Sequence, residues 1–126
     1  MYGHSLNYYN QSLFLFGGTS GYQYFRDVFR FELINRHWHR VIVDSGPNST
    51  PEPRYKHTAV GVEDRLVIFE GARNHQRVGG VWEFNLSTSK WRPVNLRDKQ
   101  PSPKFGHTAC LTGDGSSILV FGGSVE

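Results

Sequence analysis

The chain has 126 residues, of which 37% are apolar and 20% charged, and its formal net charge is +3. This composition is that of one globular domain, and its 14 glycines, nine Phe, six Tyr and three Trp favour an all-β fold, because glycine occupies turns and aromatic residues are enriched in strands. The net charge is small, and the sequence contains no run of Lys and Arg, which argues against nucleic acid as a partner. No stretch approaches the roughly 18 apolar residues that a membrane-spanning helix requires, so no membrane partner is expected either.

Cysteine is rare in this chain. Cys110 is the only one, which excludes an internal disulfide and suits a reducing compartment. We therefore expect a cytoplasmic protein, with the nucleus as a second location. Cys110 follows the last histidine repeat in an apparent inner strand, and we expect a small buried side chain there rather than a nucleophile.

The chain repeats itself along its length. A short histidine motif recurs at intervals of 53 and 50 residues, at His4, His57 and His107. Each histidine is followed by an apolar run that ends in glycine, namely "LFLFGG", "LVIFEG" and "ILVFGG". The second run has Glu70 where the other two have glycine, which places a carboxylate beside a tight turn.

In chain order, the first unit predicts four short strands. The histidine segment is the first, and a turn follows at 9–11, where Asn tolerates a left-handed backbone. The apolar run at 12–17 is the second strand, and the alternating segment at 28–32 is the third. The fourth runs from 38 to 43 and begins at a tryptophan.

The second unit repeats this order, and the third repeats its first half. Their turns are expected at 63–64 and 113–115, and the second unit's third and fourth strands at 80–86 and 91–94. The unit boundaries are approximately 1–50, 51–100 and 101–126, and the joints between them are rich in proline, which confines them to loops.

Four antiparallel strands recurring about every 50 residues are typical of a β-propeller blade. We therefore expect an all-β partial propeller of about two and a half four-stranded blades. Closed propellers have roughly four to eight blades. The chain is accordingly expected to be a fragment of a larger propeller, with open blade edges through which it could self-associate.

The Gly-His-Ser/Thr opener, the apolar run ending in Gly-Gly, the third strand and the spaced Trp38 and Trp91 resemble the kelch-repeat family over essentially the whole chain. The segments "FGGTSGYQY", followed by Asp27, and "PEPRYKHT" are further similar to a group of kelch substrate receptors of cullin-2 ubiquitin ligases. That resemblance implies a propeller pocket in which arginines hold the C-terminal carboxylate of a target peptide. It also implies a cullin-ligase adaptor, bound through regions that this chain does not contain.

The loops between second and third strands differ most between units, and binding residues tend to lie on such loops. The loop at 19–26 carries aromatic residues and an arginine, the residue types that dominate binding hot spots: Tyr22, Tyr24, Phe25 and Arg26. The loop at 72–79 carries Arg73, His75 and Arg77. Two arginines can hold a carboxylate in forked hydrogen bonds, and the resemblance places its carboxylate-binding arginines in this loop. Ordinary solvated arginines are the alternative.

The recurring histidines belong to different blades, so we expect them to be structural rather than ligands of a metal. The tryptophans are expected to pack between blades. No glycine-rich phosphate loop, HExxH or GxSxG motif is present, so the sequence predicts no catalysis, no cofactor and no metal.

We therefore expect a non-catalytic protein–protein interaction module that recognises substrate peptides for a cullin-RING ligase. The alternatives are a structural, actin-associated kelch protein and, less favoured, a fragment of a galactose-oxidase-like enzyme.

Overall fold

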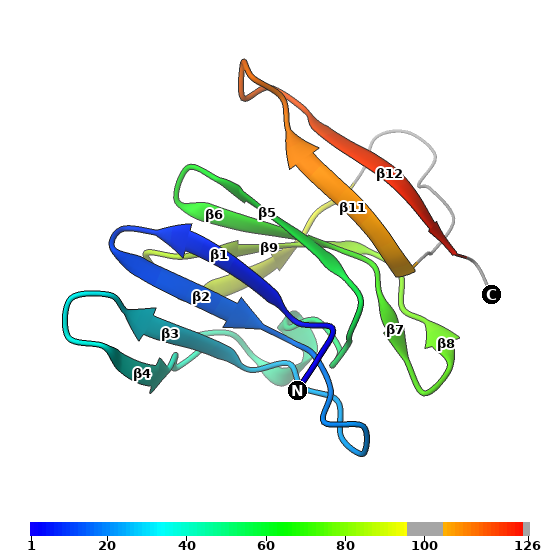
Figure 1. The fold of residues 1–126 in the computed structure, drawn as a ribbon, viewed down its shortest axis with the longest axis horizontal. Coiled ribbons are helices and arrows are strands. Elements are labelled where there is room, and N and C mark those ends of the chain that lie inside the picture. The colour runs from blue at the N-terminus through cyan, green and yellow to red at the C-terminus, as the bar shows by residue number, and fades with distance from the viewer. Residues whose placement is uncertain (96–104, 125–126) are drawn as a thin grey trace.

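The structure is a computed structural model that describes residues 1–95 and 105–124. The first two units each form a four-stranded antiparallel sheet, as the repeat predicts (Figure 1). The strands of the first sheet, in spatial order, are β1 (Ser5–Tyr9), β2 (Ser12–Phe16), β3 (Val28–Glu32) and β4 (His37–Arg40). Those of the second are β5 (Thr58–Val62), β6 (Arg65–Phe69), β9 (Val81–Asn85) and β10 (Lys90–Pro93).

The third unit contributes a hairpin of two longer strands, β11 (Phe105–Leu111) and β12 (Ile118–Ser124). The joint between the first and second sheets contains one 3-10 turn, η1 (Pro47–Ser49). The fold class predicted from the sequence is thus confirmed: the chain is all-β, with two four-stranded blades and a further two-stranded hairpin. No helix among the described residues has the length and apolar character needed to cross a bilayer.

Residues with a left-handed backbone conformation form the tight turns. Asn10 and Gln11 both have positive φ, 46° and 60°, and they join β1 to β2 in the kind of two-residue hairpin that requires this backbone. Glu70 adopts a φ of 51°, and Gly17 and Gly122 at the matching positions have 73° and 80°. The glutamate therefore stands at a position whose backbone conformation favours glycine.

One additional hairpin was not predicted. The loop between β6 and β9 folds into β7 (Ala72–Arg73) and β8 (Gln76–Arg77). Its two-residue turn consists of Asn74 and His75, with φ of 50° and 62°.

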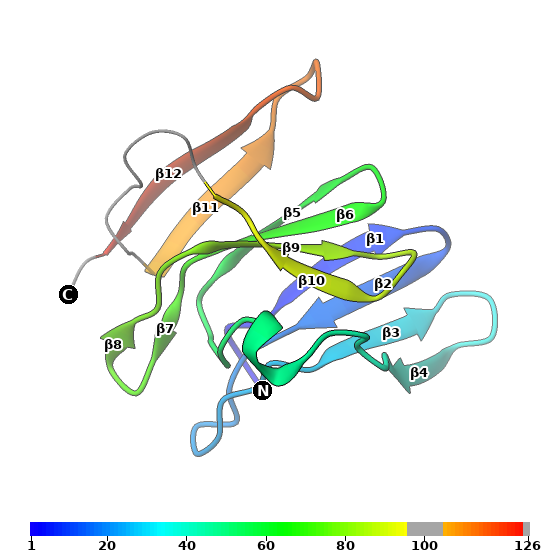
Figure 2. The same ribbon diagram turned by 180° about the vertical axis from the view of Figure 1, so that it is seen from behind.

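The sheets are arranged as a fan. Figures 1 and 2 show that the first strands of neighbouring units lie side by side, β1 next to β5 and β5 next to β11. Backbone hydrogen bonds at the start of each unit join neighbours: the Lys56 amide donates to the Gly3 carbonyl over 2.8 Å, and the Gly106 amide donates to the Lys56 carbonyl over 3.0 Å. The same link thus recurs at both joints, as expected for repeated blades.

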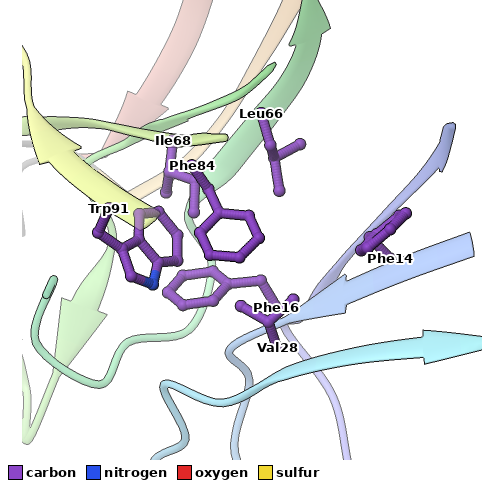
Figure 3. Close-up of a cluster of buried hydrophobic side chains, with 7 residues drawn as sticks. All are labelled: Phe14, Phe16, Val28, Leu66, Ile68, Phe84 and Trp91. Atoms are coloured by element: carbon purple, nitrogen blue, oxygen red, sulfur yellow. The ribbon is translucent and has the colours of Figure 1, made fainter. Parts of the chain in front are cut away.

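The core lies between the first and second sheets (Figure 3). Trp91 packs on Phe16 of the preceding sheet, with ring centroids 5.1 Å apart, and on Phe84 of its own sheet at 4.7 Å. Trp91 is 5% exposed, whereas Trp38 at the matching position in the first unit is 53% exposed. The expected packing between blades is therefore confirmed for Trp91. The buried cluster consists of Phe14, Phe16, Val28, Leu66, Ile68, Phe84 and Trp91.

The expected burial of Cys110 is wrong, because this cysteine is exposed. The third unit packs on the second through β11, and Cys110 lies on that strand without a further sheet over it in the described part of the chain. Its strand position was predicted correctly, but burial depends on the neighbouring blade rather than on the strand itself.

Candidate binding site

The β7–β8 hairpin forms one wall of a cavity of about 590 Å³. Arg73 and Arg77, the two arginines singled out in the sequence, both border it, together with a third arginine, Arg54. His75 lies at the exposed tip of the hairpin and is not part of the lining. The cavity is lined by Glu52, Arg54, Arg73, Asn74, Gln76, Arg77, Val78, Gly79 and Trp82.

Backbone hydrogen bonds fix the root of this hairpin. The Tyr55 amide donates to the Ala72 carbonyl over 3.0 Å, and the Ala72 amide donates back to the Tyr55 carbonyl over 2.9 Å. The Val78 amide donates to the Gly71 carbonyl over 2.9 Å. The hairpin is therefore attached both to its own blade and to the joint that leads from the first blade.

Arg54 lies beneath the cavity and was not among the site residues predicted from the sequence. Its side chain is 1% exposed. Its Nη1 donates to the Glu70 carbonyl over 2.9 Å and its Nε to the Glu52 carbonyl over 3.1 Å. Burial lowers the pKa of Arg54 to about 10, while the charge of Glu52 acts in the opposite direction. The guanidinium accordingly remains charged at neutral pH, and it adds a buried positive charge to the site.

The two hairpin arginines differ in their surroundings. The Nη1 of Arg73 lies 3.7 Å from the Oε2 of Glu52, and the two side chains are 41% and 67% exposed, so this ion pair is weak. Across residues 1–95 and 105–124, no carboxylate lies within ion-pair distance of Arg77. Arg73 is thus held lightly by a replaceable carboxylate, and Arg77 is available to a ligand.

The strand register of the hairpin places the side chains of Arg73 and Arg77 on opposite faces. Ala72 pairs with Arg77 and Arg73 pairs with Gln76. Because cross-strand partners share a face and successive residues alternate, Arg73 and Arg77 leave opposite faces of the hairpin. The hairpin brings them to one cavity, but not to one face.

The aromatic loop of the first blade does not form a single surface. Tyr22 is 99% exposed, whereas the ring of Tyr24 packs against Tyr55 with centroids 5.5 Å apart. Phe25 borders an apolar cavity beside β3 and β4, and Arg26 borders a different cavity next to the joint between blades. Tyr24 thus packs on the joint that carries the root of the arginine hairpin, and the Phe25 carbonyl accepts a hydrogen bond of 3.2 Å from the Arg54 amide of the same joint.

The recurring histidine of the second unit is structural, as predicted. His57 is buried, and its Nε2 shares a hydrogen bond of 2.9 Å with the hydroxyl of Ser5 in the preceding blade. Burial, followed by the charge of Arg54 and the neighbouring His107 and His4, lowers the pKa of His57 to about 3, so the ring is neutral at physiological pH. In the described residues, no three His, Cys, Asp or Glu side chains are grouped to hold a metal ion.

Comparison with known proteins agrees with this architecture. The family model described as the KLHDC2/KLHL20/DRC7 Kelch-repeats domain matches residues 1–126. Kelch domain-containing protein 10 of Homo sapiens is 29% identical over 111 residues, covering 86% of this chain and 24% of that protein. Tip elongation aberrant protein 1 of Schizosaccharomyces pombe is 31% identical over 131 residues, covering 97% of this chain and 11% of that protein.

The chain is also similar to a protein of another kind, the flagellar outer arm dynein alpha chain of Chlamydomonas reinhardtii. It is 29% identical over 129 residues, covering 96% of this chain and 3% of that protein. The chain thus spans less than a quarter of the length of each of these three curated relatives. Kelch repeats are in general non-catalytic interaction domains. With a family model that matches the whole sequence and blades of the matching architecture, the chain belongs to the kelch-repeat family.

Proposed function

We propose that this chain is a non-catalytic protein-binding module that holds the C-terminal carboxylate of a peptide at the β7–β8 hairpin. The observation that carries the proposal is the convergence of three arginines, Arg54, Arg73 and Arg77, on one cavity of about 590 Å³. Guanidinium groups form strong charge-assisted hydrogen bonds with carboxylates, and an unmodified polypeptide presents one such group at its C-terminus.

The arginines have different roles in this proposal. Arg54 is engaged by backbone carbonyls and contributes its charge from below. Arg73 binds the carboxylate directly, because its present partner Glu52 forms only an exposed pair at 3.7 Å that an incoming anion can displace. Arg77 approaches from the other face of the hairpin. Asn74 and Gln76 supply polar contacts to the peptide backbone, and Trp82 supplies an apolar one.

The more specific form of the proposal is substrate recognition for a cullin-RING ubiquitin ligase, in the cytoplasm or nucleus. It is supported by the similarity of "FGGTSGYQY" and "PEPRYKHT" to such receptors. An adaptor would then bind to another region of a longer protein.

The test is a binding titration, by fluorescence anisotropy, of a peptide selected from a library with free C-termini. The same peptide with an amidated C-terminus is the matched ligand, and we expect its Kd to be at least about tenfold higher. Arg73→Ala is expected to raise the Kd of the free-acid peptide and to leave the Kd of the amidated peptide unchanged. Arg26→Ala, which removes an exposed arginine from the other loop, is the control. Equal affinity for acid and amide would refute a carboxylate site.

A further inference from the structure

The β7–β8 hairpin extends beyond the sheet of its own blade and carries its two arginines on opposite faces (Figures 1 and 2). Arg77 lies opposite Ala72, which is the residue next to Arg73 in the chain. Successive residues of a strand point to opposite faces, so the two arginine side chains leave the hairpin in opposite directions and end about 10 Å apart. One carboxylate, held in a fork by one guanidinium, does not span that separation. A carboxylate bound at Arg73 therefore leaves Arg77 without an anionic partner.

The charges around the cavity are not balanced by one ligand carboxylate. The described residues that line the cavity include three arginines and one carboxylate, Glu52, which lies 3.7 Å from Arg73. Arg54 donates to backbone carbonyls, which carry no formal charge. In the part of the chain that the structure describes, Arg77 has no carboxylate within ion-pair distance. A ligand with two negative charges would balance this lining, whereas a ligand with one would not.

The backbone of Arg77 is fixed at the root of the hairpin. Its cross-strand partner Ala72 exchanges two backbone hydrogen bonds, of 3.0 and 2.9 Å, with Tyr55. The next residue, Val78, donates its amide to the Gly71 carbonyl over 2.9 Å. Arg77 thus lies between two anchored positions, so a ligand that binds its guanidinium has to order only the side chain.

We propose that the site takes a peptide with two anionic groups. The C-terminal carboxylate binds Arg73, and the side chain of a Glu or Asp among the last three residues of the peptide binds Arg77. An extended peptide advances about 3.3 Å per residue, so three residues cover the roughly 10 Å between the two guanidinium groups. This inference rests on the proposed carboxylate site and narrows its ligands to peptides with an acidic C-terminal segment.

The expected gain from the second contact is modest. The Arg77 side chain is exposed, and exposed ion pairs contribute little because water screens them. An acidic side chain at the correct position should therefore lower the Kd by about three- to fivefold.

The experiment uses the peptide selected for the carboxylate site, resynthesised with Glu or with Gln at each of its last three positions. Each peptide is prepared as the free acid and as the amide, and its Kd is measured by fluorescence anisotropy. We expect the Glu form to bind about three- to fivefold more tightly than the Gln form at one of the three positions. The preference for acid over amide measures the contact with Arg73, and the preference for Glu over Gln measures the contact with Arg77.

Two matched variants assign these preferences to their arginines. Arg77→Gln should abolish the preference for Glu and retain the preference for the free acid, while Arg73→Gln should do the reverse. Arg26→Ala, at an exposed arginine in the other loop, should retain both preferences. Arg77 has no ion pair among the described residues, so Arg77→Gln should leave the thermal denaturation curve unchanged.

The outcomes separate this inference from the proposed function. A preference for the free acid without a preference for Glu at any of the three positions would overturn the inference and leave the carboxylate site intact. A preference for Glu that persists in Arg77→Gln would also overturn it. Equal binding of acid and amide would remove the carboxylate site, and the inference with it.

Discussion

The indole of Trp91 and the ring of Phe16 meet across two blades with centroids 5.1 Å apart, although 75 positions separate them in the chain. We expect Trp91→Ala to lower the free energy of unfolding by about 3–5 kcal/mol, because it removes a large buried side chain and leaves a cavity. Trp38→Ala, at the matching but half-exposed position, should cost about 1 kcal/mol or less. Urea denaturation of the two variants and the wild type measures both losses. Equal losses would contradict this difference in packing.

The buried His57 predicts a pH-dependent stability. The pKa of the His57 ring is about 3 in the folded chain, against an ordinary value of 6.5. Between these values the unfolded chain binds a proton that the folded chain excludes, so the free energy of unfolding falls as the pH falls below 6.5. By pH 5 the loss is about 2 kcal/mol. Urea denaturation at pH 7 and pH 5 measures it.

The matched variant for this test is His57→Gln, which keeps a polar partner for Ser5 but cannot titrate. It should be less stable than the wild type at pH 7 and lose less stability on going to pH 5. The other five histidines are unchanged in it, so they contribute similarly to both proteins. Identical pH dependence would mean that His57 is accessible to protons in the folded chain.

The buried Arg54 predicts a stability role that is separate from ligand binding. Arg54→Met keeps an apolar stem but removes the hydrogen bonds to the Glu70 and Glu52 carbonyls. We expect a loss of about 2–4 kcal/mol, because bonds from charged donors are strong and the Glu70 carbonyl loses a buried donor. Arg26→Met, at an exposed position, should change stability by less than about 0.5 kcal/mol. Thermal denaturation of both variants provides the comparison, and an unaffected Arg54→Met would disprove the role.

Alanine substitutions at Gly17 and Gly21 distinguish backbone strain from a steric clash of the added methyl group. Both have positive φ, 73° and 97°, so alanine is strained at either position by about 1–2 kcal/mol. At Gly17 the new Cβ would also lie 2.7 Å from Cε1 of His57 and 2.8 Å from the carbonyl oxygen of Arg54, whereas at Gly21 nothing lies within 4 Å. We expect Gly17→Ala to cost at least about 2 kcal/mol more than Gly21→Ala in chemical denaturation. Similar costs would show that the blades readjust.

The repeat made most of the fold predictable. Each local signal occurs more than once in the same register, so the sequence predicted several features correctly. These are the strand order in each unit, the turn at Asn10 and Gln11, and the packing of Trp91. The β7–β8 hairpin was not predicted, because its turn at Asn74-His75 lacks the glycine that usually marks a two-residue turn. The exposure of Cys110 was not predictable either, because the burial of an inner strand depends on the neighbouring blade.

The candidate site was predictable in composition but not in geometry. The arginines of the second loop were identified from spacing and residue type, and they do border one cavity. That Arg73 and Arg77 leave opposite faces follows from a register that only the unpredicted turn defines. Arg54 was missed because it lies in a proline-rich joint, although its position just before the Tyr-Lys-His segment was a signal that joint and blade interact.

The reciprocal hydrogen bonds between Tyr55 and Ala72 involve only backbone atoms, which every amino acid except proline can supply. The root of the hairpin is therefore insensitive to the identity of the side chains at its tip. Insertions at Asn74 and His75 would lengthen the loop without disturbing either blade, so this turn is a natural position for grafting a foreign recognition sequence onto the scaffold.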